Sequence, residues 1–137
     1  MNIIVAVDDK NGMMFNGRRI SQDKAVRKKI SELIQGKLLW FNEYTMTQYK
    51  GEPFPVCVDA NFLSKVASDE YCFVENVELS GVKDSIDSMI IFRWNRKYPS
   101  DFKLDVLPES CGFGCAYSED FAGNSHEKIT MEIWRKL

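Results

Sequence analysis

The sequence contains very little histidine: His126 is the only one among its 137 residues. Metal-dependent hydrolases and nucleases hold their ions with several histidine, cysteine and carboxylate ligands placed close together. One histidine cannot build such a set, so we exclude a metallo-hydrolase or nuclease and expect no metal ligands. No serine or cysteine lies at a recognisable nucleophile elbow, which also argues against a Ser-His-Asp triad. We expect His126 to be a loop histidine or a switchable surface charge.

Long apolar runs and a strong charge bias are also absent. No apolar run approaches the roughly 20 residues that a membrane-spanning helix requires, and the first residues lack the pattern of a signal peptide. The 18 basic and 20 acidic residues leave a formal net charge of −2, which provides no overall attraction to nucleic acid. We therefore expect a cytoplasmic protein that binds neither membranes nor nucleic acids.

Four cysteines are present, and their positions argue against a metal or redox centre. Cys57 and Cys72 lie within apolar runs, where a cysteine acts as a small core residue. Cys111 and Cys115 lie on either side of Phe113, and a metal site there would need two further soft ligands nearby. We expect neither a metal nor a redox site at these cysteines.

The first strand carries the strongest structural signal. Ile3, Ile4, Val5 and Val7 form an apolar, β-branched run, which predicts a strand over residues 3–8, buried on both faces at the centre of an α/β sheet. A turn and a glycine-containing loop follow it. Residues 21–33 predict a helix with Ser21 as its cap, Asp23 in its first turn and Gly36 at its end. Ligands bind at the carboxyl ends of parallel strands, so the loop before this helix is placed where a site should lie.

The remaining pattern predicts an α/β fold in one domain. A short helical stretch is predicted at residues 43–49, and a helix that begins at 59 or 60 is predicted to include residues 64–67. Further strands are predicted at residues 37–41, 55–59, 70–77 and 89–94. Strands that alternate with helices predict parallel crossovers. Two closing strands, at 113–118 and 128–135, have no helix between them and predict an antiparallel edge.

Several segments, taken in order, resemble the dihydrofolate reductase family. Residues 6–14 resemble its first strand and methionine-bearing loop, and residues 20–23 resemble the acidic motif that holds the pterin. Residues 88–101 resemble a late strand with its loop, and the two closing strands resemble those of the family. The resemblance implies a single dihydrofolate reductase-like domain over residues 1–137. Its sheet would be mostly parallel, with an antiparallel C-terminal edge strand and short helices on both faces.

The segments that hold the nicotinamide cofactor in that family differ in this chain. Asn42 and Glu43 follow the second predicted strand, where the family has glycine and arginine, and Glu75 and Asn76 replace a pair of glycines. Carboxylates near both phosphate positions would repel a dianion, by about 4 kcal/mol for unit charges ~4 Å apart at an effective dielectric of ~20. Residues 51–71 are also too few for the family's adenosine-binding region. We expect no cofactor, no NADPH binding and no reduction of dihydrofolate.

The positions that bind the pterin substrate in the family also carry different residues in this chain. Arg18 and Arg19 replace a tryptophan of the family's first loop, Arg27 replaces a ring that stacks on the pterin, and Phe92 replaces a threonine. We predict a ligand site at the strand ends with Asp23 as the catalytic candidate. The candidate ligand-binding residues are Asn16, Arg18, Arg19, Asn42, Glu75, Asn76, Arg93 and Asn95. The alternative is that these are solvated loop residues and that Asp23 only interacts favourably with the positive end of the helix dipole.

Three classes of function fit these observations. The first is a dihydrofolate reductase-like protein that binds a small planar or polar ligand without NADPH-dependent reduction. The second is an enzyme: an oxidoreductase of this type with altered cofactor use, or acid–base chemistry by Asp23 with Arg19 or Asn76. The third is a partner-binding module that uses an exposed sheet edge, for which a homodimer is one arrangement. We favour the first.

Overall fold

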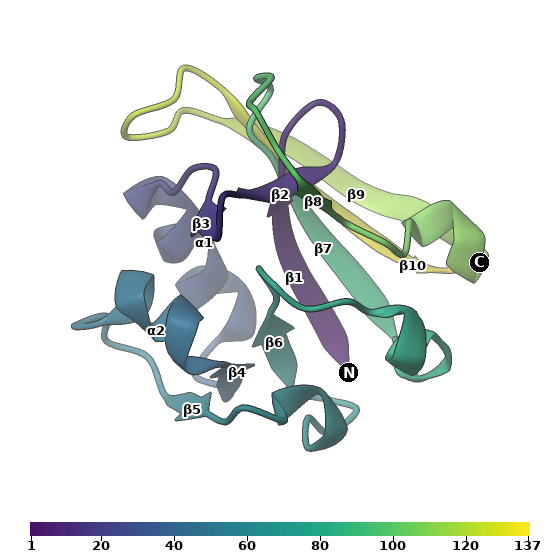
Figure 1. Ribbon diagram of the computed structural model, residues 1–137. Coiled ribbons are helices and arrows are strands. Elements are labelled where there is room, and N and C mark those ends of the chain that lie inside the picture. Colours follow the sequence, from purple (N-terminus) through teal and green to yellow (C-terminus); the bar gives the residue numbers. More distant parts are fainter.

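A computed structural model describes residues 1–137 and contains a large and a small β-sheet (Figure 1). The large sheet consists of β1 (Asn2–Val7), β4 (Leu39–Phe41), β5 (Val56–Val58), β6 (Tyr71–Phe73), β7 (Ser88–Arg93), β9 (Phe113–Phe121) and β10 (Ile129–Lys136). The small sheet consists of β2 (Gly12–Phe15), β3 (Arg18–Arg19) and β8 (Phe102–Lys103). The helices are α1 (Lys24–Ile34) and α2 (Glu43–Tyr49), with 3₁₀ turns η1 (Phe62–Ser64), η2 (Ser80–Ser85) and η3 (Pro108–Cys111).

The strand order of the large sheet is β5-β4-β6-β1-β7-β10-β9, which confirms a mostly parallel sheet with an antiparallel C-terminal edge. β1 lies in the centre and pairs in parallel with β6 and β7. β10 is antiparallel to both β7 and β9. The edge itself is β9, so the strand predicted at residues 128–135 lies one position inside it.

β1 is central because both of its faces are apolar. Ile3, Ile4, Val5 and Val7 have no exposed surface. Ile4 packs on the face that α1 covers, whereas the other three pack on the opposite face. Complete burial of each such side chain contributes about 1.5–3 kcal/mol relative to exposure.

α1 covers its face of the sheet with an apolar stripe. Val26, Ile30 and Ile34 are buried at helical spacing, as the sequence pattern predicted. The predicted cap, Ser21, is wrong: Asp23 caps the helix, and its side chain accepts a hydrogen bond from the Ala25 N–H. The helix ends through left-handed Gln35 and Gly36 rather than at Leu33.

Two other expectations differ from the structure. The helix predicted over residues 64–67 is absent, and only η1 forms. The Asp59 carboxylate accepts from the Asn61 N–H at 2.7 Å, and only the short η1 turn follows it. The fourth predicted strand stops at Phe73, because Glu75 turns toward Arg19.

The small sheet was not expected from the loop that follows β1. Asn16 and Gly17 have φ angles of 53° and 74° and form the turn between β2 and β3. An Asn-Gly pair favours this type of hairpin turn because both residues tolerate positive φ. Asn16 and Arg18, on either side of Gly17, are both exposed. None of the helices has the length and apolarity needed to cross a bilayer.

Candidate functional site

The carboxylate of Asp23 binds the loop between β9 and β10. Oδ1 accepts from the N–H groups of Ala25 and Asn124, both at 2.8 Å. Oδ2 accepts from the Ser125 N–H at 2.9 Å, the Ser125 hydroxyl at 3.2 Å and His126 Nδ1 at 2.7 Å. Burial raises the pKa of a carboxyl, but these hydrogen bonds outweigh burial and hold the pKa of Asp23 well below its ordinary value. Asp23 is therefore ionised and fully occupied by groups of its own chain.

The loop approaches Asp23 this closely because residue 123 is glycine. A Cβ atom at Gly123 would lie 2.7 Å from Asp23 Oδ2 and 2.7 Å from the His126 carbonyl oxygen. These distances are shorter than nonbonded atoms tolerate. The Gly123 N–H also donates to the His126 carbonyl at 2.9 Å, which closes the turn.

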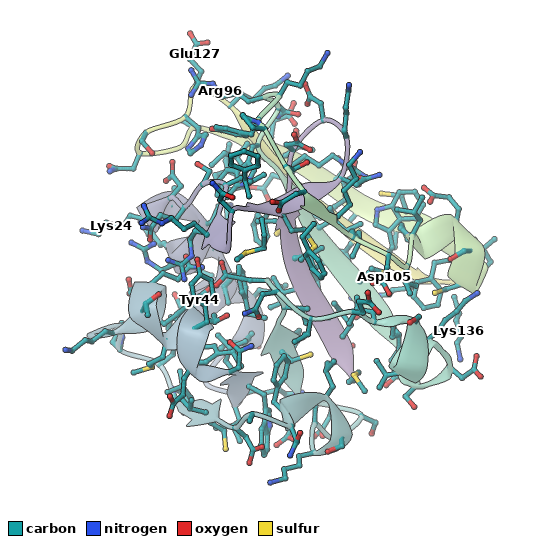
Figure 2. All side chains as sticks on the ribbon, viewed as in Figure 1. Lys24, Tyr44, Arg96, Asp105, Glu127 and Lys136 are labelled. Atoms are coloured by element: carbon teal, nitrogen blue, oxygen red, sulfur yellow. The ribbon has the colours of Figure 1, made fainter.

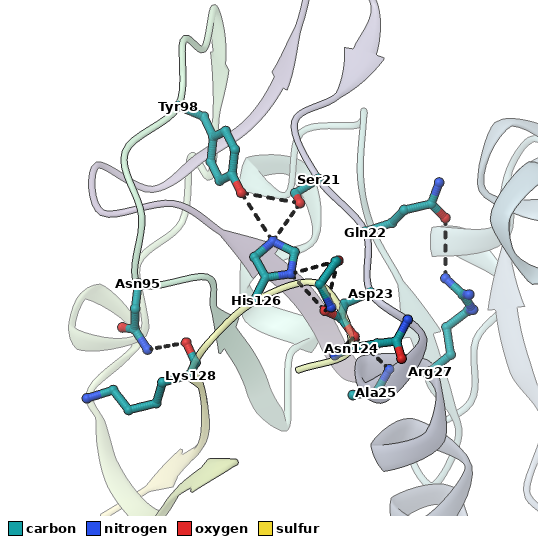
Figure 3. Close-up of polar contacts among 11 residues, drawn as sticks. Ser21, Gln22, Asp23, Ala25, Arg27, Asn95, Tyr98, Asn124, His126 and Lys128 are labelled. Atoms are coloured by element: carbon teal, nitrogen blue, oxygen red, sulfur yellow. Dashed lines mark hydrogen bonds and ion pairs between the residues drawn. The ribbon is translucent and has the colours of Figure 1, made fainter. Parts of the chain in front are cut away.

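His126 is buried, with 7% of its surface exposed, so the expected surface position is wrong although the loop position is correct. Because the Asp23 carboxylate can only accept, Nδ1 donates to it, and Nε2 of the neutral ring is an acceptor. The hydroxyl of Ser21 lies 2.8 Å from Nε2 and that of Tyr98 lies 3.1 Å from it. Figure 3 shows the imidazole between the Asp23 carboxylate on one side and these two hydroxyls on the other. Trp94 stacks on the ring, with centroids 4.5 Å apart.

Asp8 fixes the position of Tyr98 and was not identified from the sequence. It follows β1, is 1% exposed, and its Oδ2 accepts from the Tyr98 N–H at 3.0 Å. Oδ1 accepts from the N–H groups of Lys10 and Gly12 at 2.9 and 2.7 Å. Burial opposes the charged form, but these backbone hydrogen bonds lower the pKa of Asp8 overall. The loops after β1 and β7 are thus tied to one carboxylate.

A small cavity lies beside Ser21 and Asp23. Its wall also includes Trp94, Arg19 and Glu75, together with apolar side chains from β1, α1 and β6. The cavity leaves about 10 Å³ of free space, which is room for about one water molecule. The indole N–H of Trp94 is buried and has no hydrogen-bond acceptor. Ser21, Asp23 and Trp94 thus share the wall of one small cavity.

Arg19 and Glu75 form an ion pair at the wall of this cavity. Arg19 Nε lies 2.8 Å from Glu75 Oε2, and an Nη2 donates to Oε1 at 3.2 Å. The same guanidinium donates to Thr47 at 2.8 Å and lies over the Tyr44 ring, 4.5 Å from its centroid. Both side chains of the ion pair are largely buried. The guanidinium of Arg19 is thus held by the protein itself.

An open cleft of about 580 Å³ adjoins the cavity, and both share Arg19 and Ile20 in their walls. The cleft is lined by Phe15, Asn16, Arg18, Arg19, Ile20, Tyr98 and Pro99. The Phe15 ring is 43% exposed. Arg18 is exposed and makes no ion pair.

The other predicted site residues lie elsewhere. Asn42 donates to Asn76 at 2.8 Å, which ties the ends of β4 and β6 together. Neither residue lines the cavity or the cleft.

Arg93 and Asn95 also line neither the cavity nor the cleft. Arg93 pairs with Glu132 at 3.0 Å, and Asn95 donates to the Lys128 carbonyl at 3.1 Å. Arg96 and Glu127 lie at the end of the molecule where β7 ends and β10 begins, opposite the end at which Lys136 lies (Figure 2). The structure therefore brings Asp23, Arg19 and Glu75 together around the cavity, with Asn16 and Arg18 in the adjoining cleft.

No group of three or more histidine, cysteine, aspartate or glutamate side chains is arranged to hold a metal ion. All four cysteines are free thiols. Cys72 is buried in the core as expected, and burial raises the pKa of its thiol to about 12.

Comparison with known proteins identifies the fold. No protein-family model matches the sequence, and no curated protein matches it either. The structure, in contrast, is similar to that of dihydrofolate reductase from Enterococcus faecalis complexed with NADP(H) and RAB-propyl, with a TM-score of 0.66. The similarity covers 98% of this chain and 95% of that chain, at 8% sequence identity. The fold is dihydrofolate reductase-like.

This result confirms the resemblance that the order of the sequence motifs indicated. In this dihydrofolate reductase-like chain, the acidic residue at the start of α1 is bound by the β9–β10 loop rather than exposed to a cleft. The similarity at 8% identity concerns the fold. The chemistry has to be argued from the side chains.

Proposed function

We propose that this dihydrofolate reductase-like protein binds a small planar ligand with a single negative charge in the cleft beside Tyr98, without NADPH-dependent reduction. The observation that carries the proposal is the unpaired guanidinium of Arg18 next to the exposed Phe15 ring, within a cleft of about 580 Å³. An arginine can bind a carboxylate through two parallel hydrogen bonds. Aromatic rings offer flat surfaces against which a planar group stacks.

The charges around the cleft favour a monoanion over a dianion. Arg18 and Arg19 both line it, but Glu75 neutralises Arg19 through two short contacts. One uncompensated positive charge therefore remains for a ligand. The expected ligand is a planar carboxylate, or a zwitterion of the same size.

The residues at the ends of β4 and β6 do not fit a nicotinamide dinucleotide. The side-chain oxygen of Asn42 caps α2 by accepting from the Thr45 N–H, and its amide nitrogen donates to Asn76 Oδ1, so the oxygen and nitrogen of Asn42 are both occupied. Glu43 lies in the first turn of α2, where a phosphate would otherwise be favoured by the helix dipole. These contacts support binding without this cofactor.

The experiment is a thermal-shift and calorimetry panel of planar aromatic carboxylates, pterins, nucleotides and NADPH. A ligand that binds only the folded state raises the melting temperature by mass action. We expect a monoanionic planar compound to bind, and Arg18→Ala to weaken its binding about 10- to 100-fold, the effect of losing a charged hydrogen bond. Arg96→Ala, an exposed arginine outside the cleft, is the matched control. Equal binding by wild type and Arg18→Ala would contradict the proposal.

A partner-binding module is the second candidate, because β9 presents a nine-residue free edge. Tyr117 on this strand is 50% exposed. An unpaired edge of this length can pair with another strand, including that of a second copy. Light scattering coupled to size exclusion tests it, since Tyr117→Lys would shift a β9-mediated dimer to monomer.

A further inference from the structure

The row Asp23–His126–Ser21 has the hydrogen-bond order of a nucleophilic triad. The carboxylate accepts from Nδ1 at 2.7 Å, and Nε2 faces the Ser21 hydroxyl at 2.8 Å. A triad is recognised by these roles and distances and occurs on unrelated folds in different chain orders. The sequence concealed it because the serine and the histidine lie 105 positions apart and no strand-turn-helix elbow surrounds the serine.

A purely structural role explains the contacts on the Asp23 side of the imidazole but not those of Nε2 with Ser21 and Tyr98. The loop is already held to Asp23 by two backbone N–H groups and the Ser125 hydroxyl. The β9–β10 loop therefore does not need the hydrogen bonds of His126 Nε2 to stay in place. Yet Nε2 is turned to two hydroxyls, and Ser21 is partly exposed at the wall of the small cavity.

Two features of Trp94 are consistent with a catalytic role for His126 and Ser21. Its ring stacks on the imidazole at 4.5 Å and an interplanar angle of 22°, which fixes the ring and stabilises a positive charge on it. Trp94 also lines the cavity beside Ser21, and its buried N–H has no acceptor. An unsatisfied buried donor is costly, and a developing oxyanion would satisfy it.

We propose that Ser21 is the nucleophile of an acyl-transfer site that hydrolyses esters of a small carboxylic acid, with His126 as general base, Asp23 as its positioning residue and the Trp94 N–H as the oxyanion donor. The Ser21 oxygen forms a bond to the acyl carbon while its proton passes to Nε2. The ester C–O bond then breaks, and the alcohol leaves with that proton.

Water completes the reaction and restores the site. It attacks the acyl-Ser21 ester and gives one proton to Nε2. The carboxylic acid departs, and the Ser21 oxygen takes the proton back. The hydrolysis needs no metal, oxidant or cofactor.

The two adjoining spaces define the substrate class. The space beside Ser21 is small, with room for about one water-sized group, so it favours the smallest acyl groups, such as acetyl, over longer chains. The alcohol part would lie in the open cleft, near Tyr98 and Arg18. The placement of the alcohol part in the cleft rests on the proposed ligand-binding function. The reactivity of Ser21 is independent of that proposal.

The test is the reaction of the full chain with p-nitrophenyl acetate, followed by release of p-nitrophenol and by mass spectrometry for an acetyl group. We expect either turnover or a stable acetyl adduct on Ser21, and slower reaction with the butyrate ester. Ser21→Ala should abolish the protein-dependent reaction. Ser118→Ala, an exposed serine on β9, should leave it unchanged.

Two further variants separate the roles. Trp94→Phe keeps an aromatic ring on the imidazole but removes the N–H, and should slow the reaction about 10²- to 10³-fold. Tyr98→Phe removes the second hydroxyl near Nε2 and so tests Tyr98 as the nucleophile: the readout is the position of the acetyl group, which should be Ser21. Circular dichroism and thermal melting establish that each variant is folded.

The outcomes are decisive. Release that is equal in wild type and Ser21→Ala, acetylation confined to lysines, or an adduct on Tyr98 would overturn the proposal. An unchanged rate in Trp94→Phe would overturn the assignment of the oxyanion donor. Ser21→Ala distinguishes the two proposals: it should abolish the reaction with p-nitrophenyl acetate while a planar monoanion still binds in the cleft, which Ser21 does not line.

Discussion

His126 Nδ1 donates to the Asp23 carboxylate at 2.7 Å and so joins two residues 103 positions apart in the chain. The same carboxylate caps α1 through the Ala25 N–H. The start of the first helix, the β9–β10 loop and the imidazole are therefore held by one side chain. A change at any of these groups should affect the others.

Position 123 in the β9–β10 loop has no space for a side chain. In Gly123→Ala, the added Cβ would lie 2.7 Å from both Asp23 Oδ2 and a backbone carbonyl, so the loop has to move away from α1. We expect a loss of about 2 kcal/mol in the free energy of unfolding, measured by urea denaturation. Gly81→Ala is the control, because a Cβ there meets no atom within 4 Å. Equal stability of the two variants would show that the loop does not need this close approach.

Asp23 should make the protein sensitive to acid. Its pKa in the folded state is lowered, so its stabilisation is complete above the unfolded pKa of about 3.9 and is lost as the pH falls toward the folded value. We expect Asp23→Asn to be about 2–4 kcal/mol less stable than wild type at pH 7, because the buried donors lose a charged acceptor. The variant should also lose less stability than wild type between pH 5 and pH 2.

Urea denaturation at several pH values measures both effects. Asp69→Asn is the matched control, because Asp69 is exposed. It should follow the wild-type profile. If Asp23→Asn lost stability on acidification as steeply as wild type, the acid sensitivity would have to arise from other carboxylates, of which Asp8 is the first candidate.

Local features of the sequence predicted the parts of the fold that depend on local physics. The run at residues 3–8 marked the central strand because both faces are apolar, and α2 spans residues 43–49 as predicted. The Asn16–Gly17 pair is typical of a hairpin turn, whereas the prediction for this segment is a loop.

The candidate site could not be derived in the same way. The burial of His126 depends on the path of the β9–β10 loop, and that path depends on hydrogen bonds to Asp23 from far along the chain. No spacing rule links such residues. Topology placed Arg19, Asp23 and Glu75 at one end of the sheet, but it could not show that Arg93 points to Glu132 on β10.

The Arg19–Glu75 ion pair should contribute more to stability than a more exposed pair of the same type. Glu75→Gln leaves a largely buried guanidinium without its charged partner, which costs about 3 kcal/mol. Glu132→Gln breaks the Arg93 pair, whose side chains are 29% and 18% exposed, and should cost about 1 kcal/mol or less. Urea denaturation of both variants gives the difference. Equal costs would mean that solvent screens the two pairs alike.

NADPH should not bind appreciably. Glu43 stands at the start of α2, so a pyrophosphate there would meet a carboxylate, and the side chains of Asn42 and Asn76 bond to one another at the ends of β4 and β6. Isothermal titration with NADPH should give no saturable heat, with thermal melting of the same sample as proof of folding. A dissociation constant in the low micromolar range corresponds to about 8 kcal/mol of binding free energy. That result would contradict the prediction, because these loops offer no set of contacts from which such an affinity could arise.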